Sequence, residues 1–283
     1  MRLGMHLSIG KGLVAALARA EWLGCETLQI FSGNPNAWRE VAIPPASAEL
    51  FRNDERRLRI RPTVLHTPYL LNLATSDDLI YGRSVNALTS ALHRATLLDA
   101  EYVVTHIGSH GGRGYDDGVR RVQQAVSSAL DGSPGECALL LEGSSGAGYT
   151  IGSRFEELAE ILSGAQRYST RLGVALDTAH LWGAGYDISS PEAVNRVIGE
   201  FDDVVGLTWL RVMHCNDTKV ALGSRRDRHW HIGEGNIGVE GFRALVNHGA
   251  LSGLPGILET PMDEPGRDER NLHVLKSLRS AQD

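Results

Sequence analysis

Short apolar runs alternate with longer amphipathic stretches along this chain. The apolar runs, four to six residues long, predict buried β-strands at residues 2–7, 27–31, 63–66, 102–106, 138–142, 173–177, 210–215 and 256–259. The stretches between them repeat their apolar positions with the period of an α-helix. They predict helices at residues 10–23, 47–59, 77–98, 116–130, 154–161, 191–201, 239–246 and 268–279.

Strand and helix alternate strictly, which is the pattern of parallel strands joined by crossover helices. Eight such repeats in 283 residues fit a closed (β/α)8 TIM barrel better than an open doubly wound sheet. No linker, charge block or low-complexity tract interrupts the alternation. We therefore expect an α/β fold with one barrel domain over residues 1–283.

The composition indicates the class of protein and the compartment to which this barrel belongs. Apolar residues make up 42% of the chain and charged residues 22%, which is typical of soluble globular proteins. No apolar run approaches the roughly 20 residues that span a bilayer, and no signal peptide is visible, so we expect no membrane partner. Cys25, Cys137 and Cys215 are few and widely spaced, so disulfides are not expected and the cytoplasm is the default location.

The net charge of −6 is a mild argument against a nucleic-acid partner, because such proteins usually carry a basic surface. Two considerations weaken it. Some of the carboxylates counted are candidates to hold metal ions, and each divalent ion adds two positive charges. Local charge also matters more for binding than the total.

Residue types that bind metals gather at the ends of the expected strands. Six of the eight strands finish at or beside such a residue, namely His66, His106, Glu142, Asp177, His214 and Glu259. The active site of a barrel enzyme lies at the carboxyl ends of its strands. Any one of these residues is more simply a cap or a satisfied histidine, but six at equivalent positions predict one shared cavity.

Three further candidates lie just beyond strand ends. His180 follows Asp177 by three residues, and Asp227 and His229 are two apart, so both can point the same way in an extended segment. His231 continues that alternation and is a rival ligand. Mixed histidine and carboxylate donors suit zinc, with manganese or iron as substitutes. Nine donors are too many for one ion and suit two or three.

These residues lie within longer stretches that resemble a known family. The stretches are Gly4-Met5-His6-Leu7-Ser8, Leu176-Asp177-Thr178-Ala179-His180, Gly183-Ala184-Gly185-Tyr186-Asp187, Met213-His214-Cys215-Asn216-Asp217, Gly223-Ser224-Arg225-Arg226-Asp227-Arg228-His229, Gly233-Glu234-Gly235-Asn236-Ile237-Gly238 and Leu258-Glu259-Thr260. Together they resemble bacterial endonuclease IV, the zinc-dependent apurinic/apyrimidinic (AP) endonucleases, also called deoxyribonuclease IV. The resemblance covers nearly the whole chain and implies a barrel of the xylose-isomerase-like superfamily.

The resemblance also implies how the nine donors are grouped around three zinc ions. His66 and His106 would bind the first ion, and Glu142 would bridge it to the second. Asp177, His214 and Glu259 would complete the second site, while His180, Asp227 and His229 would bind the third. Glu142 or Glu259 would orient the attacking water. The implied reaction is hydrolysis of the phosphodiester 5′ to an abasic site in double-stranded DNA, which leaves a 3′-hydroxyl.

Candidate DNA contacts follow from basic residues and from the resemblance. Lys219, Arg225, Arg226 and Arg228 lie in one short region where phosphate contact is expected. Tyr69 and Leu70 resemble residues that wedge into the minor groove and expose the damaged nucleotide. Asn36 occupies the position of an arginine that usually enters the DNA stack beside the abasic gap, so the sequence departs from the family there. We expect the enzyme to act as a monomer.

Two other functions compete with this interpretation. Metal-dependent sugar isomerases and epimerases share the barrel, so the fold alone does not decide between them. They generally need one or two ions and no wedge, whereas His180 and the segment from Asp227 to His229 indicate a third ion. A binding module with a structural metal is the other alternative, but structural zinc sites favour cysteine-rich tetrahedra that this sequence lacks.

Overall fold

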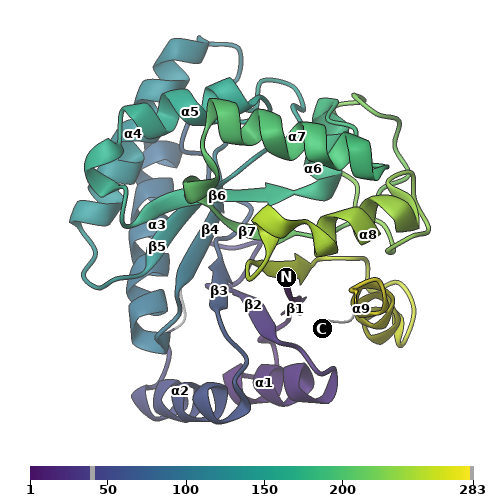
Figure 1. Cartoon of the computed structure of the whole chain (residues 1–283). Coiled ribbons are helices and arrows are strands. Elements are labelled where there is room, and N and C mark those ends of the chain that lie inside the picture. The colour runs from purple at the N-terminus through teal and green to yellow at the C-terminus, as the bar shows by residue number, and fades with distance from the viewer. Residues whose placement is uncertain (39–41, 281–283) are drawn as a thin grey trace.

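The eight expected strands form one closed barrel in the computed structural model, which describes residues 1–38 and 42–280 (Figure 1). All strand pairs are parallel and follow chain order, and β1 pairs with β8 to close the barrel. The strands are β1 (Arg2–Leu7), β2 (Thr27–Phe31), β3 (Thr63–His66), β4 (Tyr102–His106), β5 (Ala138–Glu142), β6 (Leu172–Asp177), β7 (Leu210–His214) and β8 (Pro255–Leu258). The fold prediction is confirmed, and no strand end moves by more than one residue.

Helices surround the strands within the described residues (Figure 1). They are α1 (Leu13–Trp22), α2 (Pro45–Leu58), α3 (Asp78–Leu98), α4 (Tyr115–Asp131), α5 (Phe155–Ser163), α6 (Thr178–Ala184), α7 (Pro191–Val204), α8 (Gly238–Asn247) and α9 (Arg267–Ser277). Eight correspond to the predicted helices. The sequence prediction missed α6, a short helix that begins directly after β6. Asp177 caps it by accepting a hydrogen bond from the His180 backbone N–H at 2.9 Å.

Close packing of β1 against β2 depends on one glycine. A Cβ atom on Gly4 would lie 1.9 Å from the carbonyl oxygen of Thr27, far inside van der Waals contact. Gly4 is paired with Thr27 on one side and with Ile257 of β8 on the other. Any larger residue here would therefore push apart the strands that close the barrel.

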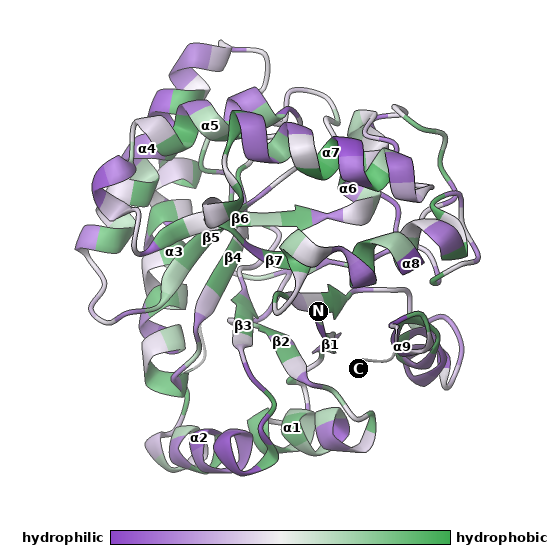
Figure 2. Ribbon diagram, in the orientation of Figure 1, coloured by the Kyte–Doolittle hydropathy of each residue, from purple (hydrophilic) through white to green (hydrophobic). Residues whose placement is uncertain are grey.

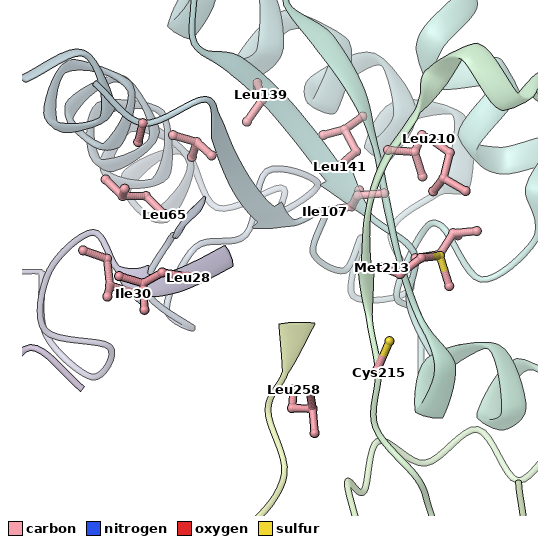
Figure 3. Close-up of a cluster of buried hydrophobic side chains, with 14 of the residues drawn as sticks. Leu28, Ile30, Leu65, Ile107, Leu139, Leu141, Leu210, Met213, Cys215 and Leu258 are labelled. Atoms are coloured by element: carbon pink, nitrogen blue, oxygen red, sulfur yellow. The ribbon is translucent and has the colours of Figure 1, made fainter. Parts of the chain in front are cut away.

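Side chains alternate between an inner and an outer layer along each strand. The inner layer is a small apolar plug at the barrel axis, made by Val64, Val104, Ala138, Leu140, Ala175, Val212 and Ile257. The outer layer packs the strands against the helices, and Figure 3 shows Leu28, Ile30 and Leu65 within it, together with Leu139 and Leu141 of β5. Figure 2 shows the hydrophilic residues concentrated on the helices around the strands.

The three cysteines are all buried and free. Burial raises the pKa of the Cys25 thiol to about 11, and of Cys137 and Cys215 to about 12. Within residues 1–38 and 42–280, no helix is sufficiently long and apolar to cross a membrane.

Candidate metal centre

The alternation within the barrel determines which strand ends carry chemistry. Along β5, Ala138 and Leu140 point into the inner plug, so Glu142 is the next inward position. The same step of two residues leads from Val64 to His66, from Val104 to His106, from Ala175 to Asp177, from Val212 to His214 and from Ile257 to Glu259. The six predicted strand-end residues therefore all stand above the apolar plug, at the carboxyl end of the barrel.

His66, His106 and Glu142 form the first of three groups of donor atoms. The Nε2 atoms of His66 and His106 lie 3.2 Å and 3.1 Å from the same carboxylate oxygen, Oε2 of Glu142. His66 is held in place by its other ring nitrogen, Nδ1, which donates to the Thr67 carbonyl at 2.7 Å. The lone pair of His66 Nε2 is thereby directed at the group.

Glu142 also belongs to the second group, with Asp177, His214 and Glu259. His214 Nδ1 lies 3.0 Å from Oε1 of Glu142, 3.3 Å from Oε2 of Glu259 and 3.9 Å from Oδ2 of Asp177. Each residue of the group offers an atom within 4.8 Å of the others. The two oxygens of Glu142 thus face different groups, as a bridging carboxylate requires.

Asp177, His180 and His229 make the third group, and Asp227 adjoins it. The Nε2 atoms of His180 and His229 lie 3.2 Å and 3.3 Å from the two oxygens of the Asp227 carboxylate. Their Nδ1 atoms donate to backbone carbonyls, of Gly143 at 2.9 Å and of Glu259 at 3.1 Å. All nine predicted ligands therefore converge on one region, which is linked through Glu142 and Asp177.

Burial and mutual charge set the protonation of these groups. Burial lowers the pKa of His214, but the Glu259 and Glu142 carboxylates outweigh it and raise that pKa to about 9. Burial opposes ionisation of Glu142 as well, yet the imidazoles of His106 and His214 hold its pKa well below the usual range. Burial likewise lowers the pKa of His229, and Asp177 and Asp227 outweigh it to raise that pKa to about 10. Without metal the centre is thus a network of imidazolium and carboxylate ions.

The donor set fits divalent metal ions. It comprises only imidazole nitrogens and carboxylate oxygens, which suit zinc, manganese and iron. The raised pKa values of His180, His214 and His229 leave these three rings positively charged without metal, and a divalent cation would replace that charge. The centre therefore has the charge balance, as well as the atoms, of a metal site.

His231, the rival ligand, belongs to none of these groups. Its ring is fully buried, with Nε2 3.2 Å from Oδ2 of Asp263. Its Nδ1 lies 3.0 Å from the side-chain nitrogen of Asn271, which donates to it. His231 therefore ties the loop that carries Asp227 and His229 to the loop after β8 and to α9.

Comparisons with known proteins agree with this site. A family model described as a xylose isomerase-like TIM barrel matches residues 17–281. The chain is 45% identical over 281 residues to a probable endonuclease 4 of Natranaerobius thermophilus, covering 98% of each protein. It is 43% identical to the probable endonuclease 4 of Chloroflexus aurantiacus, again with 98% of each covered. The chain belongs to the endonuclease IV family.

Solved structures place this family within a wider fold. The crystal structure of endonuclease IV from Thermus thermophilus superimposes with a TM-score of 0.87 at 37% identity, covering 98% of each chain. A D-tagatose 3-epimerase-like protein superimposes with a TM-score of 0.72 at 20% identity, which shows a shared fold alone. Membership of the endonuclease IV family, together with the donor groups, indicates a metal requirement.

A cavity of about 300 Å³ opens over the donor groups of this endonuclease IV member. Tyr69 lines it with 57% of its surface exposed, and its ring centroid lies 6.1 Å from that of His66 and 6.0 Å from that of His106. Leu70, beside it, is half-buried. Asn36 is exposed on the neighbouring loop, which is joined to the Tyr69 loop by a hydrogen bond from the Tyr69 N–H to the Pro35 carbonyl.

The predicted basic contacts differ in their distance from this cavity. Arg228 lines it, and its guanidinium donates to the Asp227 carbonyl at 3.2 Å. Lys219 is exposed, with its ammonium 3.6 Å from the centre of the Trp230 ring. Arg225 and Arg226 are exposed on the same loop. All four are available to an anionic partner, and only Arg228 lies beside the donor groups.

Sequence reasoning missed three residues that contact the ligands. His6 Nδ1 lies 2.9 Å from Oε1 of Glu259, and the side-chain nitrogen of Gln29 donates to that same oxygen. The amide of Asn216 donates to Asp177 at 2.6 Å, and its oxygen accepts the Glu259 N–H at 2.8 Å. One signal was available, because Gln29 is a polar residue that stands inside a short strand between the apolar residues Leu28 and Ile30.

Proposed function

We propose that this protein is an AP endonuclease of DNA repair that hydrolyses the phosphodiester 5′ to an abasic site and leaves a 3′-hydroxyl. It would use three divalent ions, mostly zinc. The observation that carries the proposal is the linked arrangement of three donor groups, joined through Glu142 and Asp177, beneath an open cavity. Membership of the endonuclease IV family supports the substrate class.

The proposed reaction is an in-line displacement at the phosphorus of an anionic phosphodiester. Divalent ions at the three groups would supply charge for the phosphoryl oxygens and for the departing O3′, and they would lower the pKa of the attacking water to near neutrality. His66 and His106 would hold the first ion and Glu142 would bridge it to the second. Asp177, His214 and Glu259 would complete the second, and His180, Asp227 and His229 the third.

The carboxylates have a second task in this proposal, which is to orient the attacking water. Glu142 and Glu259 both have pKa values below the usual range, because nearby imidazoles outweigh the effect of burial. Both are therefore ionised at neutral pH and able to accept a hydrogen bond from water. Each also has one oxygen directed at the second donor group, so the water would be held beside the ions.

Recognition of the abasic site is proposed to come from the rim of the cavity. Tyr69 is exposed and aromatic, and Leu70 follows it, so this loop is suited to enter the minor groove and unstack the lesion. Arg228, Lys219 and Arg225 are proposed to contact phosphates, which position DNA without reading its sequence. Asn36 would stand beside the gap left by the missing base.

A defined abasic duplex tests the function directly. Purified protein carrying its metal should cleave the strand once, 5′ to the lesion, and a polymerase should then extend the 3′-hydroxyl. Elemental analysis should give about three divalent ions per chain. Intact duplex should remain uncut. Failure to incise the abasic strand, or one ion or fewer per chain, would refute the proposal.

A matched variant separates chemistry from folding in this assay. Glu259→Gln should lose incision, whereas Glu55→Gln should retain it, although Glu55 is the more deeply buried of the two carboxylates. Glu55 is fully buried on α2 and accepts a hydrogen bond from the hydroxyl of Thr63, at the amino end of β3. Burial raises the pKa of Glu55 to about 7, so a neutral side chain is tolerated there. Equal rates in the two variants would contradict the assigned site.

The sugar isomerase alternative predicts different results from the same preparation. It requires turnover of a ketose or aldose and no incision of DNA. Structural similarity to epimerase-like proteins supports the fold only, and the third donor group is unexplained by a site with one or two ions.

We further propose a monomer acting in the cytoplasm as one domain over residues 1–283. Light scattering after size-exclusion chromatography tests the monomer.

A further inference from the structure

A single buried amide connects the second donor group to the strands that contribute no predicted ligand. Gln29 lies in β2 and is fully buried. Its side chain contacts His6 of β1, His214 of β7 and Glu259, which follows β8. It stands directly above the apolar plug, where a polar group is costly unless it is hydrogen-bonded. The three contacts satisfy that requirement.

The orientation of the Gln29 amide follows from its neighbours. The distance from its Nε2 to Oε1 of Glu259 is only 2.6 Å. A carboxylate that ligates a divalent ion is ionised, so its oxygens only accept hydrogen bonds. The amide nitrogen must therefore face Glu259, since a flipped amide would set two acceptor oxygens against each other. Oε1 of Gln29 then faces Nε2 of His214 at 2.9 Å.

This orientation determines which nitrogen of His214 carries hydrogen. An amide oxygen can only accept, so Nε2 of His214 must donate to it. A neutral His214 ring consequently keeps its lone pair on Nδ1. Nδ1 is the atom that lies 3.0 Å from Glu142 and 3.3 Å from Glu259. Gln29 thus directs the ligating atom of His214 into the second group.

His214 is reversed relative to three other histidines of the centre. His66, His180 and His229 present Nε2 to the carboxylates, and their Nδ1 atoms donate to backbone carbonyls. In His214 it is Nδ1 that faces the carboxylates, and the hydrogen bond on the far side is made by the Gln29 side chain. A backbone carbonyl survives any substitution, whereas a side-chain partner is removed by one mutation. The hydrogen bond that positions His214 in the second group can therefore be removed by substituting Gln29.

From this geometry we infer that Gln29 is a positioning residue for the second metal site, which fixes the tautomer of His214 and the orientation of Glu259. The inference rests on the proposed function, because it requires an ion at that group. Partners that orient ligands in this way typically change metal affinity by about 10- to 100-fold. A simple space-filling role would require only the volume of the side chain.

The test compares Gln29→Met with Thr27→Val. Methionine keeps the length and volume of glutamine but removes the amide and with it every hydrogen bond of the Gln29 side chain. Thr27 lies on the same strand, two residues earlier, and its hydroxyl donates to the Pro62 carbonyl, away from the ligands. Each zinc-loaded protein is equilibrated with a graded series of chelator concentrations and its remaining zinc is counted. Gln29→Met should release one ion at a roughly 10- to 100-fold lower chelator concentration, while Thr27→Val matches the wild type.

A spectroscopic measurement on the wild type needs no variant. With ¹⁵N-labelled histidine, the zinc-loaded protein should show His214 with hydrogen on Nε2, protected from exchange, and metal on Nδ1. The His214 signal is assigned by its loss in His214→Ala. Hydrogen on Nδ1 and metal on Nε2 would overturn the inference, even if Gln29→Met failed to fold. In a folded Gln29→Met protein, the protection of that hydrogen should be lost.

The outcomes distinguish this inference from the proposed function. A wild type that binds no ions and leaves abasic DNA intact would refute both. A wild type that binds three ions and incises abasic DNA, with Gln29→Met releasing zinc at the same chelator concentration, would refute the role of Gln29 alone. Incision of abasic DNA by the wild type, together with early release of one ion from Gln29→Met but not from Thr27→Val, supports both.

Discussion

Zinc binding to the metal-free protein should release protons, because histidines that ligate a metal must be neutral. His214 and His229 have pKa values of about 9 and about 10, raised by the carboxylates around them against the effect of burial. At pH 7.5 each is therefore more than about 95% protonated. The carboxylates contribute no protons, since Glu142 and Glu259 have pKa values below the usual range.

The expected magnitude follows from these two histidines. Loading the protein with zinc at pH 7.5 should release about two protons from them, and His180, whose pKa is also raised well above the ordinary value, should add another. Removing the first two protons costs about 5 kcal/mol at this pH, at about 1.4 kcal/mol for each pKa unit. The apparent affinity for zinc should therefore rise steeply with pH up to about pH 9.

Calorimetric titration measures this proton release. Zinc is added to metal-free protein at pH 7.5 in buffers that differ in ionisation enthalpy, and the slope of the observed heat against that enthalpy gives the number of protons. Two or more protons agree with the electrostatics of the centre. Fewer than one would refute it, because the histidines would already be neutral before the metal arrives.

The same shifts predict how the metal-free protein responds to pH. A histidine whose folded pKa is raised contributes stability that is fully present below its unfolded pKa of about 6.5 and is lost as pH rises through the folded value. His214 and His229 therefore stabilise the metal-free fold at neutral pH, and this contribution disappears between about pH 7 and pH 10. The melting temperature of metal-free protein should fall over that window, while the zinc-loaded protein, whose histidines carry no such protons, should show a smaller change.

Three substitutions test the remaining assignments. Asp227→Asn should remove one of three ions selectively, as counted by elemental analysis, because the Asp227 carboxylate lies between His180 and His229. Full metal content with full activity would mean that the third site is wrongly assigned. Glu142→Gln should lower the single-turnover incision rate by orders of magnitude. DNA binding, measured by titration at fixed salt, should be retained because phosphate contacts give most of the affinity. A near-normal rate would contradict the mechanism. Asn36→Arg should tighten binding to abasic duplex about ten- to a hundredfold with a smaller change in rate, since a stacking group is worth roughly 1–3 kcal/mol. An unchanged preference for abasic over intact duplex would show that Tyr69, Leu70 or another residue already performs that role.

The hydrophobic pattern predicts the strands closely because, in a barrel, a run of residues that can be buried begins and ends where the strand does. The same period of two indicates why Glu142 and His214 point inward, once the inner plug is known. The missed helix α6 has a different cause. Asp177 is both a strand end and a helix cap, so the helix begins with no connecting loop to mark it.

The grouping of the donors was implied by the family resemblance and could not be derived from the residue pattern alone, for physical reasons. Which donors share an ion depends on distances across the barrel, which no local pattern encodes. His231 continues the alternation of Asp227 and His229, yet the chain turns it towards Asp263 and Asn271. Gln29 was missed because its role arises from residues far from it in the chain, and only the closed barrel brings them together.

The three donor groups contain no sulfur, and this determines which reagents can displace the proposed zinc ions. Oxidants attack thiolates, and sites ligated by cysteine lose their metal when sulfur is oxidised. Here every donor in the three groups is a nitrogen or an oxygen. The thiols of Cys25, Cys137 and Cys215 are buried, with pKa values of about 11 to 12, so very little thiolate forms at neutral pH. Peroxide at levels that inactivate thiolate zinc sites should therefore leave this centre loaded, while acid and chelators empty it.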